Sequence, residues 1–185
     1  MQKEFIPPQE KPEARIATVA DAADIARIQH ESWLATYPSE KAGITREDIA
    51  EHLGIVDDRA QRCANRLNLE AKDIDFIGAT YVLEIGGRVV GFCKVARGMH
   101  TGHVDALYLD PAFAQKGFGG ELFQKGLQWL GDEAPIDLEV ASYNDRAIHF
   151  YERFGFRKQD KAKPLELLGG KFLPLTLMVR DVVEK

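Results

Sequence analysis

The stretch Leu107–Leu130, LYLDPAFAQKGFGGELFQKGLQWL, decides how this chain folds. A strand-like run ends at Asp110-Pro111, and after a short loop the glycines from Gly117 onward open an amphipathic helix. Glycine lets the backbone approach a ligand closely, and a helix start offers unpaired N–H groups with partial positive charge. The order of strand, loop and glycine-rich helix start therefore predicts a binding site for a phosphate or diphosphate.

Three kinds of phosphate motif compete for this stretch. A P-loop needs Gly-x-x-x-x-Gly-Lys-Ser/Thr, but here Lys116 precedes the first glycine and no Ser or Thr follows. A dinucleotide fingerprint, Gly-x-Gly-x-x-Gly, begins at Gly117 and Gly119 but has Leu122 in its third position. What remains is a Gly-x-Gly loop that follows a strand ending in Asp-Pro.

With this loop, the stretch resembles the acyl-CoA motif of the GNAT superfamily of N-acetyltransferases. A second block, Asn144–Phe156, resembles the family's Asn-x-x-Ala-x-x-Phe-Tyr-x-x-x-Gly-Phe at every fixed position. One position departs: Ala114 stands where the family usually has Gln or Arg, and Gln115 is the candidate for a shifted substitute. The resemblance covers nearly the whole chain from Arg15 and implies an N-acetyltransferase.

The spacing of apolar residues predicts a single-domain α/β fold in a chain of 185 residues. Such a domain buries roughly 70% of its unfolded surface. The resemblance implies a mixed, mostly antiparallel sheet with a splayed parallel strand pair, flanked by helices. We expect a Pro-rich flexible arm over residues 1–12 and the GNAT domain over 13–185. Strands are predicted over 15–19, 80–85, 88–95, 103–109, 136–140 and 172–181. One helix is predicted over 57–73, and two earlier ones contain Trp33 and Leu53. Two more begin near Gly117 and Asn144.

Composition narrows the class of protein. The formal net charge of −5 argues against non-specific binding of nucleic acid. The first residues lack the apolar core of a signal peptide, and no apolar run approaches the length of a membrane span. Cys63 and Cys93 are too few for a disulfide framework and form no Cys-x-x-Cys. We therefore expect a cytoplasmic protein that binds neither membrane nor nucleic acid.

The resemblance also implies how acetyl-CoA would bind as co-substrate. The cofactor would lie between the strands 103–109 and 136–140, with its pantetheine arm along the first strand and its diphosphate on the glycine loop. The cofactor-binding residues that this implies are Leu107, Tyr108, Leu109, Gln115, Lys116, Gly117, Phe118, Gly119, Gly120 and Asn144. His100 and His103 lack a third ligand nearby, so no metal is expected.

Catalysis by this family implies a general acid and a general base. Tyr151 matches the tyrosine that protonates the leaving thiolate, although a tyrosine on an apolar helix face can equally be a core residue. The candidates for the base that takes the proton of the amine are Asp105 and His103, which share one face of their strand because they are two residues apart. Glu139 on the next strand is a weaker candidate. For His103, a packed or surface role is an equally good interpretation.

The acceptor should contact the first two helices. Trp33 and Tyr37 lie there beside Glu31 and Glu40, a combination that suits a cationic amine, whether a small molecule, a polyamine or a peptide amine. A catalytically silent domain that binds or senses acyl-CoA is the alternative from another class, and transfer of longer acyl groups or to oxygen is a third. A homodimer is possible if the last strand is an exposed edge.

Overall fold

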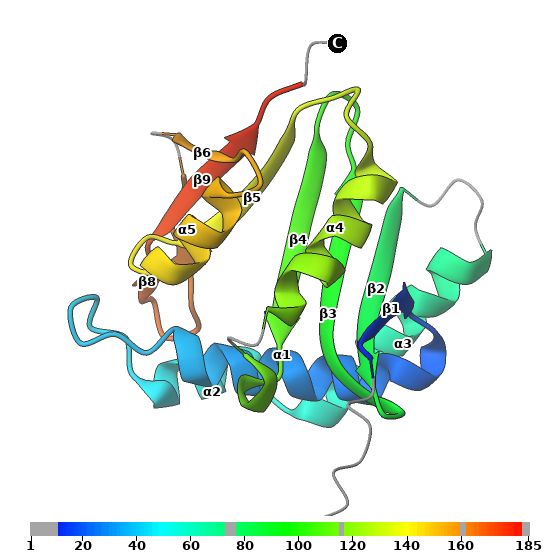
Figure 1. Cartoon of the computed structure of the whole chain (residues 1–185). Helices are drawn as coiled ribbons and strands as arrows, with labels where there is room; N and C mark the ends of the chain where they lie inside the picture. Colours follow the sequence, from blue (N-terminus) through cyan, green and yellow to red (C-terminus); the bar gives the residue numbers. More distant parts are fainter. Residues whose placement is uncertain (1–10, 73–76, 115–116, 160–161, 183–185) are drawn as a thin grey trace, which may run out of the picture.

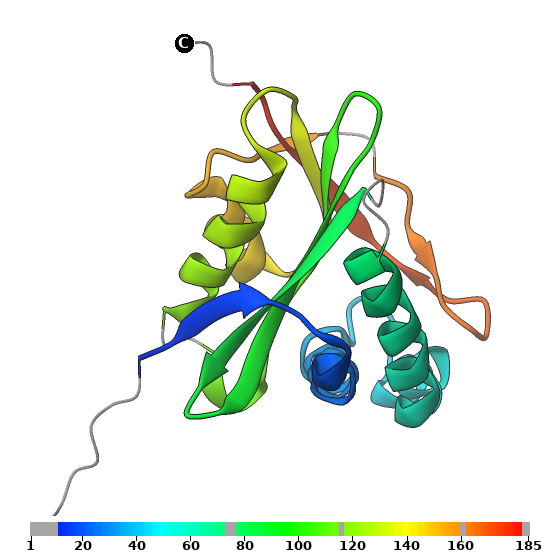
Figure 2. The same ribbon diagram turned by 90° about the vertical axis from the view of Figure 1, so that its right-hand side faces the viewer.

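The protein forms one mixed β-sheet with helices on both faces, seen in a computed structural model that describes residues 11–72, 77–114, 117–159 and 162–182 (Figures 1 and 2). Seven strands follow the order β1-β2-β3-β4-β5-β9-β6, and β7 pairs with β8 apart from them. The strands are β1 (Glu13–Ile16), β2 (Gly78–Ile85), β3 (Arg88–Arg97), β4 (Gly102–Leu109), β5 (Ile136–Ala141), β6 (Arg157–Gln159), β7 (Leu165–Glu166), β8 (Phe172–Leu173) and β9 (Leu175–Arg180). The α-helices are α1 (Ala22–Thr36), α2 (Arg46–Leu53), α3 (Val56–Lys72), α4 (Phe118–Leu130) and α5 (Asp145–Glu152), and 3-10 turns lie at Val19–Asp21 (η1) and Pro111–Phe113 (η2).

Local sequence chemistry explains most element boundaries. Thr45 and Asp48 form a capping box at the start of α2, with the Thr45 side chain accepting from the Asp48 N–H. Gly86 and Gly87, with φ of 61° and 72°, connect β2 and β3 in a tight hairpin because only glycine takes two such angles readily. The α/β architecture predicted from the sequence, with a mostly antiparallel sheet and one parallel pair, is confirmed.

Two expectations about strands are wrong. The predicted strand over 172–181 is broken at Pro174, so Phe172–Leu173 pairs with β7 and only Leu175–Arg180 joins the main sheet. β9 then lies between β5 and β6 and pairs with both, so it is not the exposed edge on which the possible homodimer was argued. The short strands β6 and β7 were not predicted, and the first strand runs over Glu13–Ile16, not 15–19.

Two further expectations concern the N-terminal arm and a possible membrane span. Of the predicted arm, residues 1–10 lie outside the described ranges, and the division at residue 13 stays a prediction. Within the described ranges, no helix is both long and apolar enough to cross a membrane.

The two faces of the sheet carry separate hydrophobic cores. α4 and α5 pack on one face around Phe123, which is fully buried among four other aromatic rings of Phe150, Tyr151, Phe154 and Phe156. α1 and α3 cover the opposite face, where Ile28, Phe92 and Ala106 are buried together (Figure 2). The side chains of β4 therefore reach both layers.

The pairing between β4 and β5 ends early. Three residue pairs join these parallel strands, Gly102–Val104 against Ile136–Leu138, and beyond them the strands diverge (Figure 1). The register of β4 against β3 also shifts at this point, because Lys94 pairs with Ala106 and Val95 with Val104. Asp105 is thus the extra residue of a β-bulge, a feature that bends a strand and re-aims its side chains.

Asp110 fixes the end of β4. Its carboxylate is buried, accepts from the Ala112 N–H at 3.0 Å, and pairs with Arg88 at 2.7 Å and Arg27 at 3.2 Å. Burial opposes ionisation, but the Ala112 N–H and the two guanidiniums outweigh it, so the pKa of Asp110 is lowered below its usual range. One carboxylate thus ties β3, α1 and the loop that leads to α4.

We predict that Asp110→Asn lowers the free energy of unfolding at pH 7 by about 1–3 kcal/mol, because it removes the charge from a buried, hydrogen-bonded group. The folded pKa lies below the unfolded value of about 3.9. The stabilisation is therefore complete above that value and disappears as the pH falls through the folded pKa. Urea unfolding of both proteins from pH 7 to pH 3 should show the difference shrinking.

The matched control is Asp132→Asn. Asp132 pairs with Arg180 at 2.6 Å but is 61% exposed, so its loss should cost at most about 1 kcal/mol. An effect of Asp110→Asn no larger than that of the control at pH 7 would contradict the anchoring role.

Candidate functional site

The diverging part of β4 presents a backbone edge toward β5. Residues 106–109 pair with β3 on one side, but no described strand pairs with their other side. The carbonyl of Leu109 accepts from the buried Ser32 hydroxyl of α1 at 2.9 Å. Backbone N–H and C=O groups are obligatory hydrogen-bonding groups, so this edge suits an extended ligand with amide groups. The predicted contact residues Leu107, Tyr108 and Leu109 all lie on it.

The start of α4 presents free N–H groups beside that edge. Gly117 is the N-cap residue with φ of 85°, a left-handed angle that favours glycine, and no side chain caps the helix. Gly119 lies against neighbouring side chains: a Cβ added there would be 3.4 Å from Leu109 and 3.8 Å from Phe150. The first turn thus combines open donors with the positive end of the helix dipole. Gln115 and Lys116, also predicted as cofactor contacts, lie outside the described residues.

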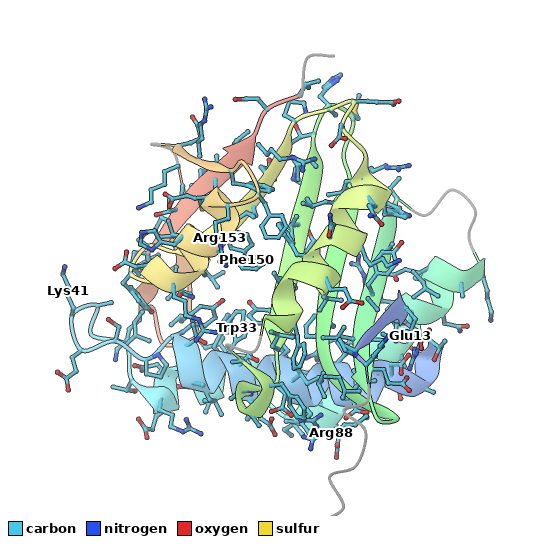
Figure 3. The ribbon with its side chains drawn as sticks, viewed as in Figure 1. Glu13, Trp33, Lys41, Arg88, Phe150 and Arg153 are labelled. Atoms are coloured by element: carbon cyan, nitrogen blue, oxygen red, sulfur yellow. The ribbon has the colours of Figure 1, made fainter. Side chains whose placement is uncertain are left out.

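Basic side chains of α5 lie next to this helix start. Arg146, His149 and Arg153 border an open groove of about 680 Å³ together with Glu152 and Phe150. A Cβ at Gly119 would lie within 4 Å of this phenylalanine. Figure 3 shows Phe150 on α5 and Arg153 at its C-terminal end, and the guanidinium of Arg153 lies 5.6 Å from the centre of the Phe150 ring. These three side chains were not predicted as site residues, although their spacing of three and four residues puts them on one helix face.

Tyr151 stands on the inner face of α5. It is 9% exposed, and its ring lies 5.4 Å from that of Phe123. Burial, with smaller effects from Tyr108 and Cys93, raises its pKa far above the usual value. No hydrogen bond from its hydroxyl to another described residue is present. The phenol is therefore protonated at neutral pH, and no described residue uses its hydroxyl as a hydrogen-bond donor or acceptor.

A chain of tyrosines bridges the diverging strands on the α1 side. The hydroxyls of Tyr37 and Tyr108 share a hydrogen bond of 2.9 Å, and the Tyr143 hydroxyl, which follows β5, donates to the Tyr37 carbonyl at 2.5 Å. Burial raises the pKa of both Tyr37 and Tyr108. The structure thus brings the predicted Tyr37 and Tyr108 together and adds Tyr143, which sequence reasoning missed because its partner lies 106 residues away.

Trp33 lies beside this chain on α1 (Figure 3). Its ring meets that of Tyr37 edge to face at 4.9 Å and stacks on His52 at 5.7 Å. Its buried indole N–H makes no hydrogen bond of good geometry to a described residue, although it lies close enough to Tyr108 to lower the pKa of that phenol. Trp33 is thus largely packed between neighbouring rings while its one donor remains available.

The two candidate bases occupy different surroundings. Asp105, on the bulge of β4, faces α3 and lies 3.6 Å from Lys94 and 3.9 Å from Arg66. The Nδ1 atom of His103 lies 2.5 Å from the carboxylate of Asp137, its partner across the paired end of β4 and β5. Asp105 therefore stands where the strands part, and His103 stands where they are still joined.

The remaining predicted residues have clear local roles. Asn144 is the N-cap of α5, and its side chain accepts from the Ala147 N–H at 3.1 Å. Cys93 is buried, which raises the pKa of its thiol to about 12, so it is no nucleophile at neutral pH. Among the described residues, no group of three or more His, Cys, Asp or Glu side chains is placed to hold a metal ion.

Comparison with known sequences identifies related proteins. The sequence model of the acetyltransferase (GNAT) family matches residues 24–156. The chain is 40% identical over 105 residues to mycothiol acetyltransferase of Propionibacterium freudenreichii subsp. shermanii, a match that covers 52% of this chain and 32% of the relative. A second mycothiol acetyltransferase, from Acidimicrobium ferrooxidans, is 38% identical over 80 residues, which is 40% of this chain and 26% of the relative. The chain thus matches a third or less of the length of these curated relatives.

Solved structures share the fold. PaiA N-acetyltransferase from Thermoplasma acidophilum, in complex with coenzyme A, superposes with a TM-score of 0.72 at 19% identity, covering 92% of this chain and 99% of that one. The putative acetyltransferase yncA from Salmonella typhimurium, with acetyl-CoA, gives 0.68 at 21% identity over 95% and 96%. At this level of identity the likeness concerns the fold, and it agrees with the architecture described above.

Proposed function

Since this chain belongs to the acetyltransferase (GNAT) family, we propose that it moves an acetyl group from acetyl-CoA to a primary amine by direct attack, with no covalent enzyme intermediate. One observation carries the proposal, the combination of three features where β4 and β5 part. They are an edge of β4 that no described strand pairs with, a start of α4 that no described side chain caps, and the buried phenol of Tyr151, which has no hydrogen bond to a described residue. These are the parts that a thioester donor with a diphosphate requires.

The proposed path of the cofactor follows the three features in turn. The pantetheine arm would pair with the backbone of Leu107 and Leu109 along the free edge of β4, and Asn144 would contact it from the start of α5. The diphosphate would accept from the N–H groups of Gly117 to Gly120, each contact contributing about 0.3–1 kcal/mol through the helix dipole. The cations of α5 would add further attraction for the phosphates.

The chemistry then needs two proton transfers. The amine attacks the thioester carbonyl, the carbon–sulfur bond breaks, and the thiolate leaves. Tyr151 is the proposed acid, because its phenol is protonated at neutral pH and has no described partner. Asp105 is the preferred base, because it lies where the strands separate, whereas His103 is bound to Asp137 at the joined end. A base is required because a free alkylamine is protonated at pH 7.

The relatives do not identify the acceptor of this chain, but they suggest which amines to test first. Mycothiol acetyltransferases match about half of this chain, so their acceptor belongs in the panel beside simple amines, polyamines and peptide amines. The decisive measurement is release of free CoA thiol from acetyl-CoA with each amine. Tight binding of acetyl-CoA without release of thiol for any amine would favour the alternative, a silent domain that binds or senses acyl-CoA.

We predict that Tyr151→Phe lowers kcat roughly 10²–10⁴-fold, the usual contribution of a general acid. Because the pKa of Tyr151 is raised far above its usual value, the wild-type rate should not fall through loss of this proton between pH 7 and pH 10. Thiol release measured across this pH range gives both the loss of kcat in the variant and the pH dependence of the wild-type rate. Tyr81→Phe on β2 is the matched control. If Tyr151→Phe left the rate unchanged at every pH, Tyr151 would not be the general acid.

Gly117→Ala should weaken acetyl-CoA binding. Both Gly117 and Gly131 cap α4 with a left-handed φ, 85° and 79°, and a Cβ at either would meet open space. Alanine should therefore cost about 1–2 kcal/mol of stability at each position. Calorimetric titration should show weaker binding in Gly117→Ala alone. Equal losses of affinity in both variants would place the diphosphate elsewhere.

Asp105→Asn should lower kcat/KM at least about 10²-fold, and His103→Asn should have a smaller effect. The acidic limb of the pH–rate profile should disappear in the Asp105 variant, since this limb reports the base in the free enzyme. The reverse order of effects would move the role to His103.

A further inference from the structure

A hollow with a surplus of positive charge opens on the α1 side of β4. Its volume is about 240 Å³, and its lining residues come from α1, α3 and the strands β2, β3 and β4. The helices α1 and α3 lie on the opposite side of the sheet from α4 (Figure 2). Four cations line it: Arg59, Arg62 and Arg66 from α3, and Lys94 from β3. Asp105 is the one carboxylate in its lining. We refer to this cavity as the basic hollow.

Half of these cations already have carboxylate partners. Arg66 binds Glu70 at 2.8 Å and reaches Asp105 at 3.9 Å, and Lys94 lies 3.6 Å from Asp105. Arg59 and Arg62 form no ion pair with any described carboxylate. These two guanidiniums lie on successive turns of α3, so the positive charge that no described carboxylate balances is concentrated in one part of the hollow.

The Arg59 side chain has a donor directed at no protein acceptor. One Nη atom donates to the Leu53 carbonyl at 3.2 Å, but the buried Nε has no hydrogen-bond partner among the described residues. Burial and the nearby Arg62 lower the pKa of Arg59, and burial and Arg66 lower that of Lys94. A buried donor without a partner costs about 1–3 kcal/mol. The guanidinium of Arg59 therefore has donor capacity that no described residue uses.

The basic hollow reaches the reacting strand. Asp105 and Ala106 belong to its lining, and Leu107, the next residue, begins the edge proposed for pantetheine. A molecule seated in the hollow could therefore present an amine beside Asp105. The surrounding cations would also favour the neutral form of that amine, which is the form that attacks. The same cations would repel a polyamine, one of the acceptors expected from the sequence.

We propose that the basic hollow binds the carboxylate or phosphate group of the acceptor, so that the substrate is an amine that carries an anion. This rests on the proposed acetyl transfer and specifies its acceptor. Arg59 and Arg62 would provide the charge-assisted hydrogen bonds, and their forked guanidiniums suit either anion.

The test compares matched amines with and without the anion. Thiol release is measured with β-alanine against β-alaninamide, with O-phosphoethanolamine against ethanolamine, and with spermidine. We expect the anionic member of at least one pair to have the higher kcat/KM, with spermidine the poorest. Arg59→Gln and Arg62→Gln should each reduce that preference roughly tenfold, the equivalent of one charge-assisted hydrogen bond. Arg157→Gln on β6 should leave it unchanged.

A second measurement needs no turnover and so separates this proposal from the first. Calorimetric titration of β-alanine and of O-phosphoethanolamine into the CoA-loaded protein should show binding that the Arg59→Gln and Arg62→Gln variants weaken. Such binding without thiol release would refute the transfer reaction and support the anion site. Equal use of both members of each pair, preference for spermidine, or an unchanged preference in both arginine variants would overturn the proposal.

Discussion

The site depends on the early end of the β4–β5 pairing. Parallel strands normally stay paired along their shared length, and here three residue pairs are followed by separation. Each strand keeps its other neighbour, β3 for β4 and β9 for β5, so the sheet remains continuous at both sides of the gap. The cost is a strand edge at residues 106–109 that no described strand pairs with, and a ligand with amides can supply hydrogen bonds that the missing strand would have supplied.

Two groups of aromatic residues hold the separated strands in place. On one face the rings around Phe123 join α4, which lies on β3 and β4, to α5, which follows β5. On the other face the hydrogen bonds of Tyr37 with Tyr108 and Tyr143 connect both strands to the end of α1. The separated strands are thus held by apolar contacts on one face and by hydrogen bonds on the other. The proposed acid Tyr151 belongs to the apolar group around Phe123.

The sequence predicted the features that local chemistry controls. The hairpin at Gly86-Gly87, the capping box at Thr45 and the helix starts at Gly117 and Asn144 follow from residue types at fixed spacing, and the structure has them all. The features that depend on register between distant segments could not be predicted in this way. The bulge at Asp105 is visible only when β4 is aligned with β3, and the break at Pro174 matters because the two halves of that segment find different partners.

The positive charge of the proposed acceptor region could not be predicted for the same reason. The aromatic and acidic residues of α1 are close together in sequence and indicated a cationic guest. The arginines of α3 looked like an ordinary charged helix surface, because nothing in their spacing reveals that the sheet leaves a hollow beneath them. Only the tertiary structure brings Arg59 and Arg62 of α3 into the lining of one hollow with Asp105 of β4.

The anchoring of Asp110 has a consequence for how the two substrates influence each other. This carboxylate holds Arg27 of α1 and at the same time caps the turn that leads to the glycine loop. α1 also contributes Ile25, Ala26 and Gln29 to the wall of the basic hollow. The two proposed binding sites, on opposite sides of the sheet, are therefore connected through the ion pair of Arg27 with the buried Asp110. If occupancy of the loop shifts that pair, the affinity of the hollow changes by the same factor as the affinity of the loop changes when the hollow fills.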